Sequence, residues 1–227
     1  MRILTWNLFH GRAVPERRHG LLAEFASTIA GWEWDVALLQ EVPPWWPPRL
    51  AAAAGAQERH VLTSRNWLLP LRRLVAERRP DLIKSNGGGC DAILVRGRAI
   101  EAHARLRLRF WPERRMVHAV RLGPDEPWVA NIHGQANPKP LARADAARAG
   151  AAVLRWAAGA PAVLGGDFNV PDPGVDGFRD AGGHGIDRFL VRGLDVVTPP
   201  RTLPRGGLSD HAPVVVELGR TAGPRAS

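Results

Sequence analysis

The sequence has one cysteine, no tyrosine and no long hydrophobic run among its 227 residues. The single cysteine, Cys90, cannot form a disulfide within the chain, which excludes a disulfide-stapled secreted scaffold. No apolar run reaches the roughly 18 residues of a membrane-spanning helix, and the first residues lack the apolar core of a signal peptide. These absences favour a cytoplasmic protein without a transmembrane segment.

Lysine is scarce as well. Only Lys84 and Lys139 are present, so arginine carries most of the formal net charge of +9. An arginine-rich surface suits a polyanionic partner such as nucleic acid or an anionic lipid. The preference for arginine over lysine, together with abundant alanine, is equally typical of a coding bias toward GC-rich codons. The charge therefore supports a polyanionic partner but does not establish one.

Length and composition predict one globular domain. A chain of this length with 45% hydrophobic residues can bury a substantial core. No internal repeat is present, and no linker divides the chain. We therefore expect a single domain over residues 1–218, followed by a disordered tail over residues 219–227, with a monomer as the default state.

Hydrophobic periodicity predicts strands that alternate with helices. Strands are expected at residues 3–8, 35–41, 92–95, 106–110, 116–122, 128–133, 161–164, 186–191 and 214–218. Helices are expected at residues 15–31, between residues 66 and 79, and at residues 141–156. Prolines over residues 43–48 exclude regular structure there. Irregular passages are expected at residues 170–185 and 198–207, and a turn at residues 87–89 that lacks the lysine of a P-loop.

The stretch Ala162–Val170 contains the clearest chemical signal. Its two glycines, Gly165 and Gly166, are expected to end a buried strand and to leave Asp167 and Asn169 beyond it. Period-two alternation points these two side chains the same way and turns the intervening phenylalanine toward the core. A carboxylate and an amide on one rim suit a cation and a phosphoryl oxygen, although this pattern is also typical of a simple turn.

Polar residues mark strand ends in separate parts of the chain, and strand ends converge on one edge of a sheet. The set comprises Asn7, Glu41, Asp167, Asn169, Asp210 and His211. Carboxylates and amides without a cysteine cluster or closely spaced histidines favour Mg²⁺ or Mn²⁺ over zinc, which indicates phosphoryl chemistry. A Ser-His-Asp hydrolase is the alternative, but the sequence has no Gly-x-Ser-x-Gly elbow. His133 ends a further strand, as a site residue or as a satisfied histidine.

Six short motifs follow one another along nearly the whole chain. They are Thr5-Trp6-Asn7, Leu39-Gln40-Glu41-Val42, Asn131-Ile132-His133, Gly166-Asp167-Phe168-Asn169, Ile186-Asp187-Arg188-Phe189 and Ser209-Asp210-His211. In this order they resemble the endonuclease/exonuclease/phosphatase superfamily, which has the DNase I-like fold. The resemblance implies an α/β (α+β) fold, a four-layer α/β/β/α sandwich of two mixed sheets flanked by helices, with the site at one edge of the sandwich.

The resemblance also implies a metal site and a water-activating residue. Glu41 is similar to the family's principal metal ligand, assisted by Asn7 and Asp210. Asp167 resembles the residue that orients or deprotonates the attacking water. Asn169 resembles the residue that holds a phosphoryl oxygen.

Two histidines and an arginine complete the implied site. His211 resembles the family's essential histidine at the phosphate, and Asp187 is the carboxylate that would pair with it and favour its charged form. His133 is similar to a second histidine that lies near the leaving oxygen in some members. Arg115 resembles an arginine that contacts the substrate phosphate, with Arg114 as the alternative.

The absence of tyrosine is a departure from the family pattern. Many nuclease members place a tyrosine beside the scissile phosphate, in the region that here reads Gly89-Cys90-Asp91-Ala92. Asp91 or Cys90 is available to fill that space, and the substrate class stays open. We expect a divalent-metal-dependent phosphodiesterase that uses in-line water attack, and we favour DNA or RNA as the substrate. The alternatives are a phosphatase or phosphodiesterase of phospholipid, phosphoinositide or nucleotide, and a non-catalytic nucleic-acid-binding protein on the same scaffold.

Overall fold

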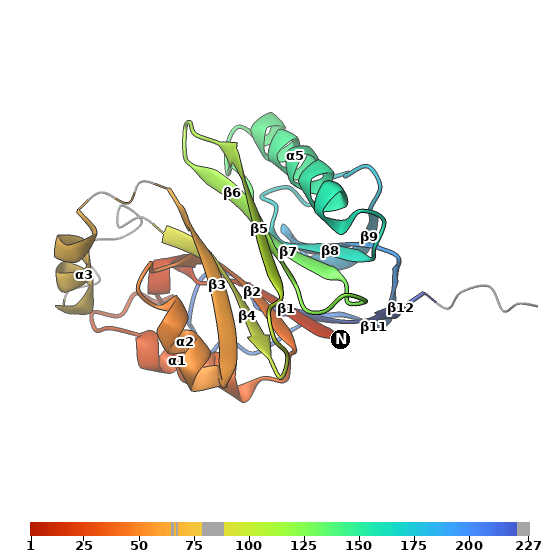
Figure 1. The fold of residues 1–227 in the computed structure, drawn as a ribbon. Helices are drawn as coiled ribbons and strands as arrows, with labels where there is room; N and C mark the ends of the chain where they lie inside the picture. Colours follow the sequence, from red (N-terminus) through yellow and green to blue (C-terminus); the bar gives the residue numbers. More distant parts are fainter. Residues whose placement is uncertain (65, 67, 79–88, 222–227) are drawn as a thin grey trace, which may run out of the picture.

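Two six-stranded β-sheets lie face to face in the computed structural model, with helices on their outer faces (Figure 1). The structure describes residues 1–64, 66, 68–78 and 89–221. The strands and helices are arranged in four layers, which confirms the α/β/β/α sandwich expected from the sequence. None of the described helices is long and apolar enough to cross a membrane.

Both sheets are mixed. In spatial order, the first contains β11 (Leu194–Thr202), β12 (Val214–Arg220), β1 (Arg2–Asn7), β2 (Val36–Val42), β4 (Gly89–Arg96) and β3 (Ala56–Thr63). The second contains β5 (Ala102–Arg109), β6 (Arg115–Arg121), β7 (Trp128–His133), β8 (Ala162–Asp167), β10 (Asp187–Arg192) and β9 (Arg179–His184). Each has one parallel pair at its centre, β1 with β2 and β7 with β8, whereas the other neighbours run antiparallel.

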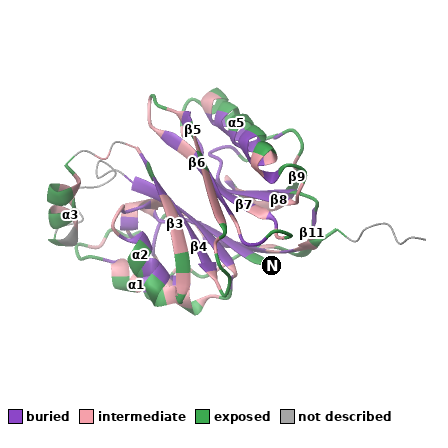
Figure 2. Ribbon diagram, viewed as in Figure 1, coloured by how far each residue is buried: buried purple, intermediate pink, exposed green. Residues whose placement is uncertain are grey.

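Three apolar layers hold the sandwich together, and Figure 2 shows the central strands as largely buried. Trp6 and Phe25 pack between the first sheet and the helices α1 (Leu22–Gly31) and α2 (Pro47–Ala54). Leu38 and Phe189 lie between the two sheets. On the outer face of the second sheet, α5 (Lys139–Ala157) packs through an alanine-rich face that includes Ala149. Small side chains let that helix approach the sheet closely.

The two glycines of the central motif are part of a strand and do not end it. Strand β8 continues through Gly165 and Gly166 to Asp167. A Cβ atom on Gly165 would lie 2.8 Å from Leu38 Cδ1, in the opposite sheet. Gly166 has φ +139, and a Cβ atom there would lie 2.0 Å from the carbonyl oxygen of Ile132. The glycines are required because neighbouring atoms leave no room for a side chain.

Several predicted elements need correction. Helix α1 begins at Leu22 and does not include Pro15. Helix α2 begins at Pro47 within the proline-rich stretch, because a proline in the first turn of a helix gives up no hydrogen bond. Strand β9 and the second half of β11 lie in passages for which irregular structure is expected, and β3 and the first half of β11 were not predicted. Helix α3 (Leu69–Arg78) forms within the expected range.

Two predicted segments that border undescribed residues also differ from the structure. Strand β12 extends to Arg220, so the tail expected from residue 219 does not begin there, and residues 222–227 lie outside the described part. Of the turn expected at residues 87–89, the first two residues lie outside the described part as well. Gly89 is the first residue of β4.

We expect Gly166→Ala to destabilise the fold by at least about 2 kcal/mol, because the new Cβ atom would collide with the backbone of β7 and its φ is unfavourable for alanine. Urea denaturation followed by circular dichroism measures the change. Gly31→Ala is the matched control, since its new methyl group would meet no neighbouring atom within 4 Å, and it should change stability by less than about 1 kcal/mol. Equal stabilities of the two variants would contradict the close approach of β7 and β8.

Candidate active site

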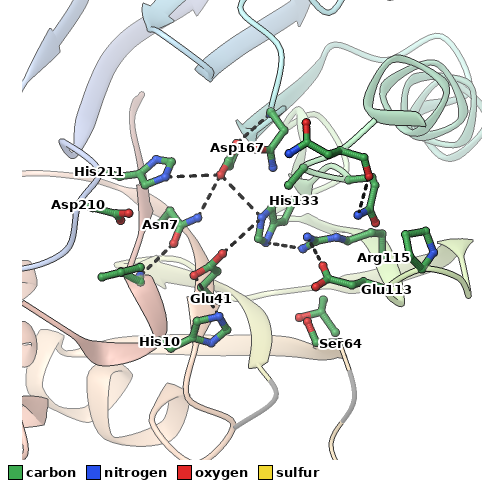
Figure 3. Close-up of a pocket in the computed structure, with 17 residues that line it drawn as sticks. Asn7, His10, Glu41, Ser64, Glu113, Arg115, His133, Asp167, Asp210 and His211 are labelled. Atoms are coloured by element: carbon green, nitrogen blue, oxygen red, sulfur yellow. Dashed lines mark hydrogen bonds and ion pairs between the residues drawn. The ribbon is translucent and has the colours of Figure 1, made fainter. Parts of the chain in front are cut away.

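One end of the sandwich holds a cavity of about 710 Å³ where strands from both sheets terminate (Figure 3). Asn7 ends β1, His133 ends β7 and Asp167 ends β8. Eight of the nine site residues expected from the sequence line this cavity: Asn7, Glu41, Arg115, His133, Asp167, Asn169, Asp210 and His211. The ninth, Asp187, lies behind His211 and contacts it. The structure thus brings the expected set together.

Asp167 is the buried centre of this site. Asn7 Nδ2 donates a hydrogen bond to Asp167 Oδ2 at 3.0 Å, and the backbone N–H of Asn169 donates to Oδ1 at 2.8 Å. Burial and the nearby charge of Asp187 raise the pKa of Asp167 to about 6, against the lowering effect of His211 and the two hydrogen bonds. A carboxylate with this proton affinity is suited to accept a proton from water near neutral pH.

The pKa of His211 is raised as well, but for this side chain the shift favours the charged form. Its Nδ1 lies 2.8 Å from Asp187 Oδ2, and its Nε2 lies 3.9 Å from Asp167 Oδ2. Burial alone would lower the pKa of His211, but the hydrogen bond to Asp187 and the surrounding carboxylates raise it to about 9. The ring is therefore an imidazolium at neutral pH. With Nδ1–H directed to Asp187, the Nε2–H remains to donate to a ligand oxygen.

The loop that carries His211 is fixed by hydrogen bonds to β1. The indole Nε1 of Trp6 donates to the carbonyl oxygen of His211 at 3.0 Å. The hydroxyl of Ser209 donates to the carbonyl oxygen of Asn7 at 2.6 Å and accepts from the backbone N–H of His211 at 3.1 Å. The Ser-Asp-His motif therefore uses its serine to position the histidine, which argues against a serine nucleophile at this residue.

Glu41 faces the same cavity from an irregularity in β2. Its φ is +50°, and the pairing of β2 with β4 shifts register at this point. One carboxylate oxygen, Oε2, lies 3.1 Å from His10 Nε2, and the other, Oε1, lies 3.7 Å from His133 Nε2. The bulge turns the Glu41 side chain out of the regular strand alternation and into the cavity.

His133 is neutral and oriented by Arg115. The guanidinium Nη1 of Arg115 donates to His133 Nδ1 at 2.9 Å, which leaves the ring proton on Nε2. Burial and the charge of Arg115 hold the pKa of His133 well below its usual range. Its Nε2 lies 3.7 Å from oxygens of both Glu41 and Asp167. Arg115 lines this cavity, whereas Arg114 lines a different one, so the structure separates the two arginines.

His10 is the site residue that the sequence did not single out. It lines the cavity with φ +53, in the short 3₁₀ turn Phe9–Gly11 that follows β1. Its ring lies over Gly89, where a Cβ atom would be 3.4 Å from His10 Cε1. Cys90 and Asp91, the residues expected to take the place of the missing tyrosine, are fully buried and do not line the cavity. The imidazole of His10 therefore covers the start of that segment instead.

Asp91 lies behind His133. Its Oδ1 is 4.0 Å from His133 Nδ1. Burial raises the pKa of Asp91 to about 8, although the charge of Arg115 opposes that effect, so this side chain is a neutral carboxylic acid at pH 7. Asp91 therefore packs behind His133 and supports this wall of the cavity.

The donor set of the cavity fits a hard divalent cation. Glu41 and Asp210 present carboxylates to the same space as the amide of Asn7. The amide oxygen of Asn7 already accepts a hydrogen bond from the N–H of Phe9 at 2.9 Å, and its second lone pair is available to a cation.

A second acidic group lies beside this donor set. Asp167, Asp187 and His211 each have a ligand atom within 4.8 Å of the others. In that group Nδ1 of His211 is occupied by Asp187 and the ring is protonated, so its geometry favours acid–base chemistry over metal binding.

We expect Asp187→Asn to lower the pKa of His211 from about 9 toward its ordinary value of 6.5, because the variant removes the charge that stabilises the imidazolium. NMR titration of the imidazole protons in EDTA measures the shift, with His211→Ala identifying the resonance. Because the folded-state pKa is raised, the stabilisation from protonated His211 is complete below pH 6.5 and is lost as the pH rises through 9. Stability should therefore fall less over that interval in Asp187→Asn. An unchanged pKa in the variant would refute the pairing.

Comparisons with known proteins agree with this arrangement. A model of the endonuclease/exonuclease/phosphatase family matches residues 4–211. No curated protein matches the sequence at a significant level. Among solved structures, an endonuclease/exonuclease/phosphatase from Beutenbergia cavernae DSM 12333 has a TM-score of 0.71 at 20% identity, covering 100% of this chain and 73% of that one.

Two further solved structures have related folds but different names. A mannosyl-6-phosphatase from Bacteroides thetaiotaomicron VPI-5482 has a TM-score of 0.66 at 17% identity, covering 96% of this chain and 99% of that one. TDP2 from Caenorhabditis elegans has a TM-score of 0.64 at 19% identity, covering 95% and 73%. At these identities the likeness shows a shared fold and leaves the substrate open. With the family match spanning most of its length, the chain belongs to the endonuclease/exonuclease/phosphatase family, whose members are generally phosphoester hydrolases.

Proposed function

We propose that this protein is a divalent-metal-dependent phosphodiesterase that hydrolyses nucleic acid by in-line attack of water. The observation that carries the proposal is the placement of Asp167 and His211 in one cavity, where the pKa values of both are raised. Asp167 has a pKa of about 6 and His211 a pKa of about 9, with Nε2 of His211 3.9 Å from Asp167 Oδ2. Such a pair supplies a proton acceptor and a proton donor at the same pH.

The proposed chemistry divides between these groups. Asp167 accepts the proton of the attacking water, and its two hydrogen bonds hold the carboxylate in place. His211 donates from Nε2 to a phosphoryl oxygen as negative charge grows there. A bound Mg²⁺ or Mn²⁺ would neutralise part of that charge, held by Glu41 and Asp210 with the amide oxygen of Asn7.

The remaining cavity residues orient the phosphate and the leaving group. Asn169 has φ +56°, and its Nδ2 donates to the carbonyl oxygen of Gly134 at 3.0 Å, which leaves its amide at the cavity wall in a fixed position. Neutral His133 carries its proton on Nε2, the atom that approaches Glu41 and Asp167. These features support a role for His133 beside the leaving oxygen and for Arg115 in holding the ring.

The net charge of +9 supports nucleic acid as the substrate, because each strand presents a row of phosphates to an arginine-rich surface. A phosphatase acting on a monoester is the competing activity within the same fold. The two differ in whether the phosphate carries a second ester, which a substrate panel resolves directly.

The test is an incubation of the purified protein with plasmid DNA, structured RNA, bis-p-nitrophenyl phosphate and p-nitrophenyl phosphate, with Mg²⁺ or with EDTA. We expect cleavage of diesters that depends on Mg²⁺ and falls at least about a hundredfold in His211→Ala, the usual lower bound for loss of positioned proton transfer. His184→Ala, an exposed histidine on β9, is the matched control and should retain activity. Near-complete activity of His211→Ala, or hydrolysis of the monoester alone, would contradict the proposal.

A further inference from the structure

A second cavity, of about 420 Å³, lies where the edge of the first sheet meets the edge of the second. Strand β3 is the outer strand of the first sheet, β5 is the outer strand of the second, and Figure 1 shows β3 beside β5 and β6. We call this cavity the arginine groove. It is lined by His60, Val61, Leu62, Arg105, Arg107, Arg114 and Met116.

The groove arises from the alternation of β5. Leu106 and Leu108 pack toward α5 in the outer core layer, so the alternating residues Arg105 and Arg107 point to the opposite face, which looks toward the first sheet. On the neighbouring strands β6 and β7 this inner face is buried and closes against the first sheet, through apolar residues such as Val120 and Val129 and through the polar side chain of Asn131. The inner face therefore changes from buried on β6 and β7 to exposed on β5, where Arg105 and Arg107 reach solvent.

The arginines of the groove have no carboxylate partner in the part of the chain that the structure describes. Among the described residues, no carboxylate forms an ion pair with Arg105, Arg107 or Arg114. The Nε of Arg114 is buried and has no hydrogen-bond partner there. Two acidic side chains in neighbouring segments have other partners, since Glu58 is 2.9 Å from His60 Nδ1 and Glu113 pairs with Arg115. Guanidinium groups without a carboxylate partner are suited to bind the oxygens of phosphate groups.

The arginine groove adjoins the active-site cavity along two segments of chain. On β3 the residues up to Leu62 line the groove, and the next two, Thr63 and Ser64, line the active-site cavity. In the other sheet Arg114 lines the groove, while Arg115 lines the active-site cavity. The N–H of Ser64 donates to the carbonyl oxygen of Arg114 at 2.9 Å and joins the two segments between the cavities. A ligand longer than one cavity would cross this seam to enter the other.

We infer that the arginine groove binds the phosphate groups of a nucleic-acid strand whose scissile phosphate lies at His211. The inference rests on the proposed function and assigns a direction to the bound strand, out of the active-site cavity across the seam at Ser64 and along β5. A strand carries its phosphates on one backbone, so binding of the scissile phosphate places further phosphates beside Arg105 and Arg107. A substrate with a single phosphate would not reach them.

The binding test uses Arg105→Gln/Arg107→Gln in the His211→Ala background, with a fluorescein-labelled single-stranded oligonucleotide in EDTA and fluorescence anisotropy as the readout. We expect the dissociation constant to rise about tenfold, and the slope of its logarithm against the logarithm of salt concentration to fall by about 1.4, for two lost phosphate contacts on a single strand. The control is Arg148→Gln/Arg201→Gln, which removes the same charge from exposed positions on α5 and β11. Equal losses in the two double variants would overturn the inference.

The kinetic test uses the same substitutions in the otherwise unchanged protein. We expect the groove variant to hydrolyse bis-p-nitrophenyl phosphate at the unaltered rate and to show a raised KM for an oligonucleotide with little change in kcat. A parallel fall in turnover of the small diester would overturn the inference, because the arginines would then act on the reaction itself. If the protein hydrolyses no diester but the groove variant alone loses oligonucleotide affinity, the proposed reaction is refuted and the groove is supported.

Discussion

A hydrogen bond between the two sheets fixes the geometry of the site. Asn7 ends a strand of the first sheet, Asp167 ends a strand of the second, and the Asn7 amide donates to the Asp167 carboxylate at 3.0 Å with both side chains buried. Deeper in the sandwich, Gln40 Nε2 donates to Asn131 Oδ1 at 2.7 Å across the same interface. Apolar layers tolerate small sliding, whereas buried polar groups must meet at defined distances, so these bonds set the relative position of the sheets.

The raised pKa values of Asp167 and His211 follow from that position. Asp167 lies deep enough for burial to raise its pKa, and the same placement puts its charge near His211. Asp187, paired with Asp167 in the antiparallel register of β8 and β10, holds the other side of the imidazole. The Asp187 carboxylate thus holds the Nδ1 proton of the His211 ring, while the Asp167 carboxylate remains available to a reactant. Two acidic residues with the same intrinsic chemistry acquire different roles because of where two adjacent strands place them.

The site was predictable where polar residues follow apolar runs, since strand ends of a sheet meet at one edge. Asn7, His133 and Asp167 were found in this way. His10 was missed because it lies beyond a strand end in a left-handed 3₁₀ turn, a conformation with no periodic signal. The positive φ of Glu41 could not be predicted from the sequence for a similar reason. A bulge changes which way a side chain points without changing the hydrophobic pattern.

The strands missed by the sequence analysis share one property, which is their place at a sheet edge. Strands β3, β9 and β11 each pair on one side only. Edge strands carry polar residues, glycine and proline, as β9 does at Gly182 and Gly183 and β11 at Pro199 and Pro200, because no second neighbour requires their N–H groups. The hydrophobic pattern that marks an interior strand is therefore weak in them.

The fourth edge strand, β5, was predicted, but alternation alone did not say which face its arginines take. Charge on an edge protects against pairing with another chain, and a coding bias would add arginine anywhere. At the opposite edge of the same sheet, however, arginines are neutralised, since Arg179 pairs with Asp195 and Arg188 with Asp180. On β5 itself Arg109 pairs with Asp145, whereas Arg105 and Arg107 form no ion pair with a described carboxylate. The inferred phosphate ligand beside the active-site cavity would supply a partner for these two exposed arginines, which neither edge protection nor composition does.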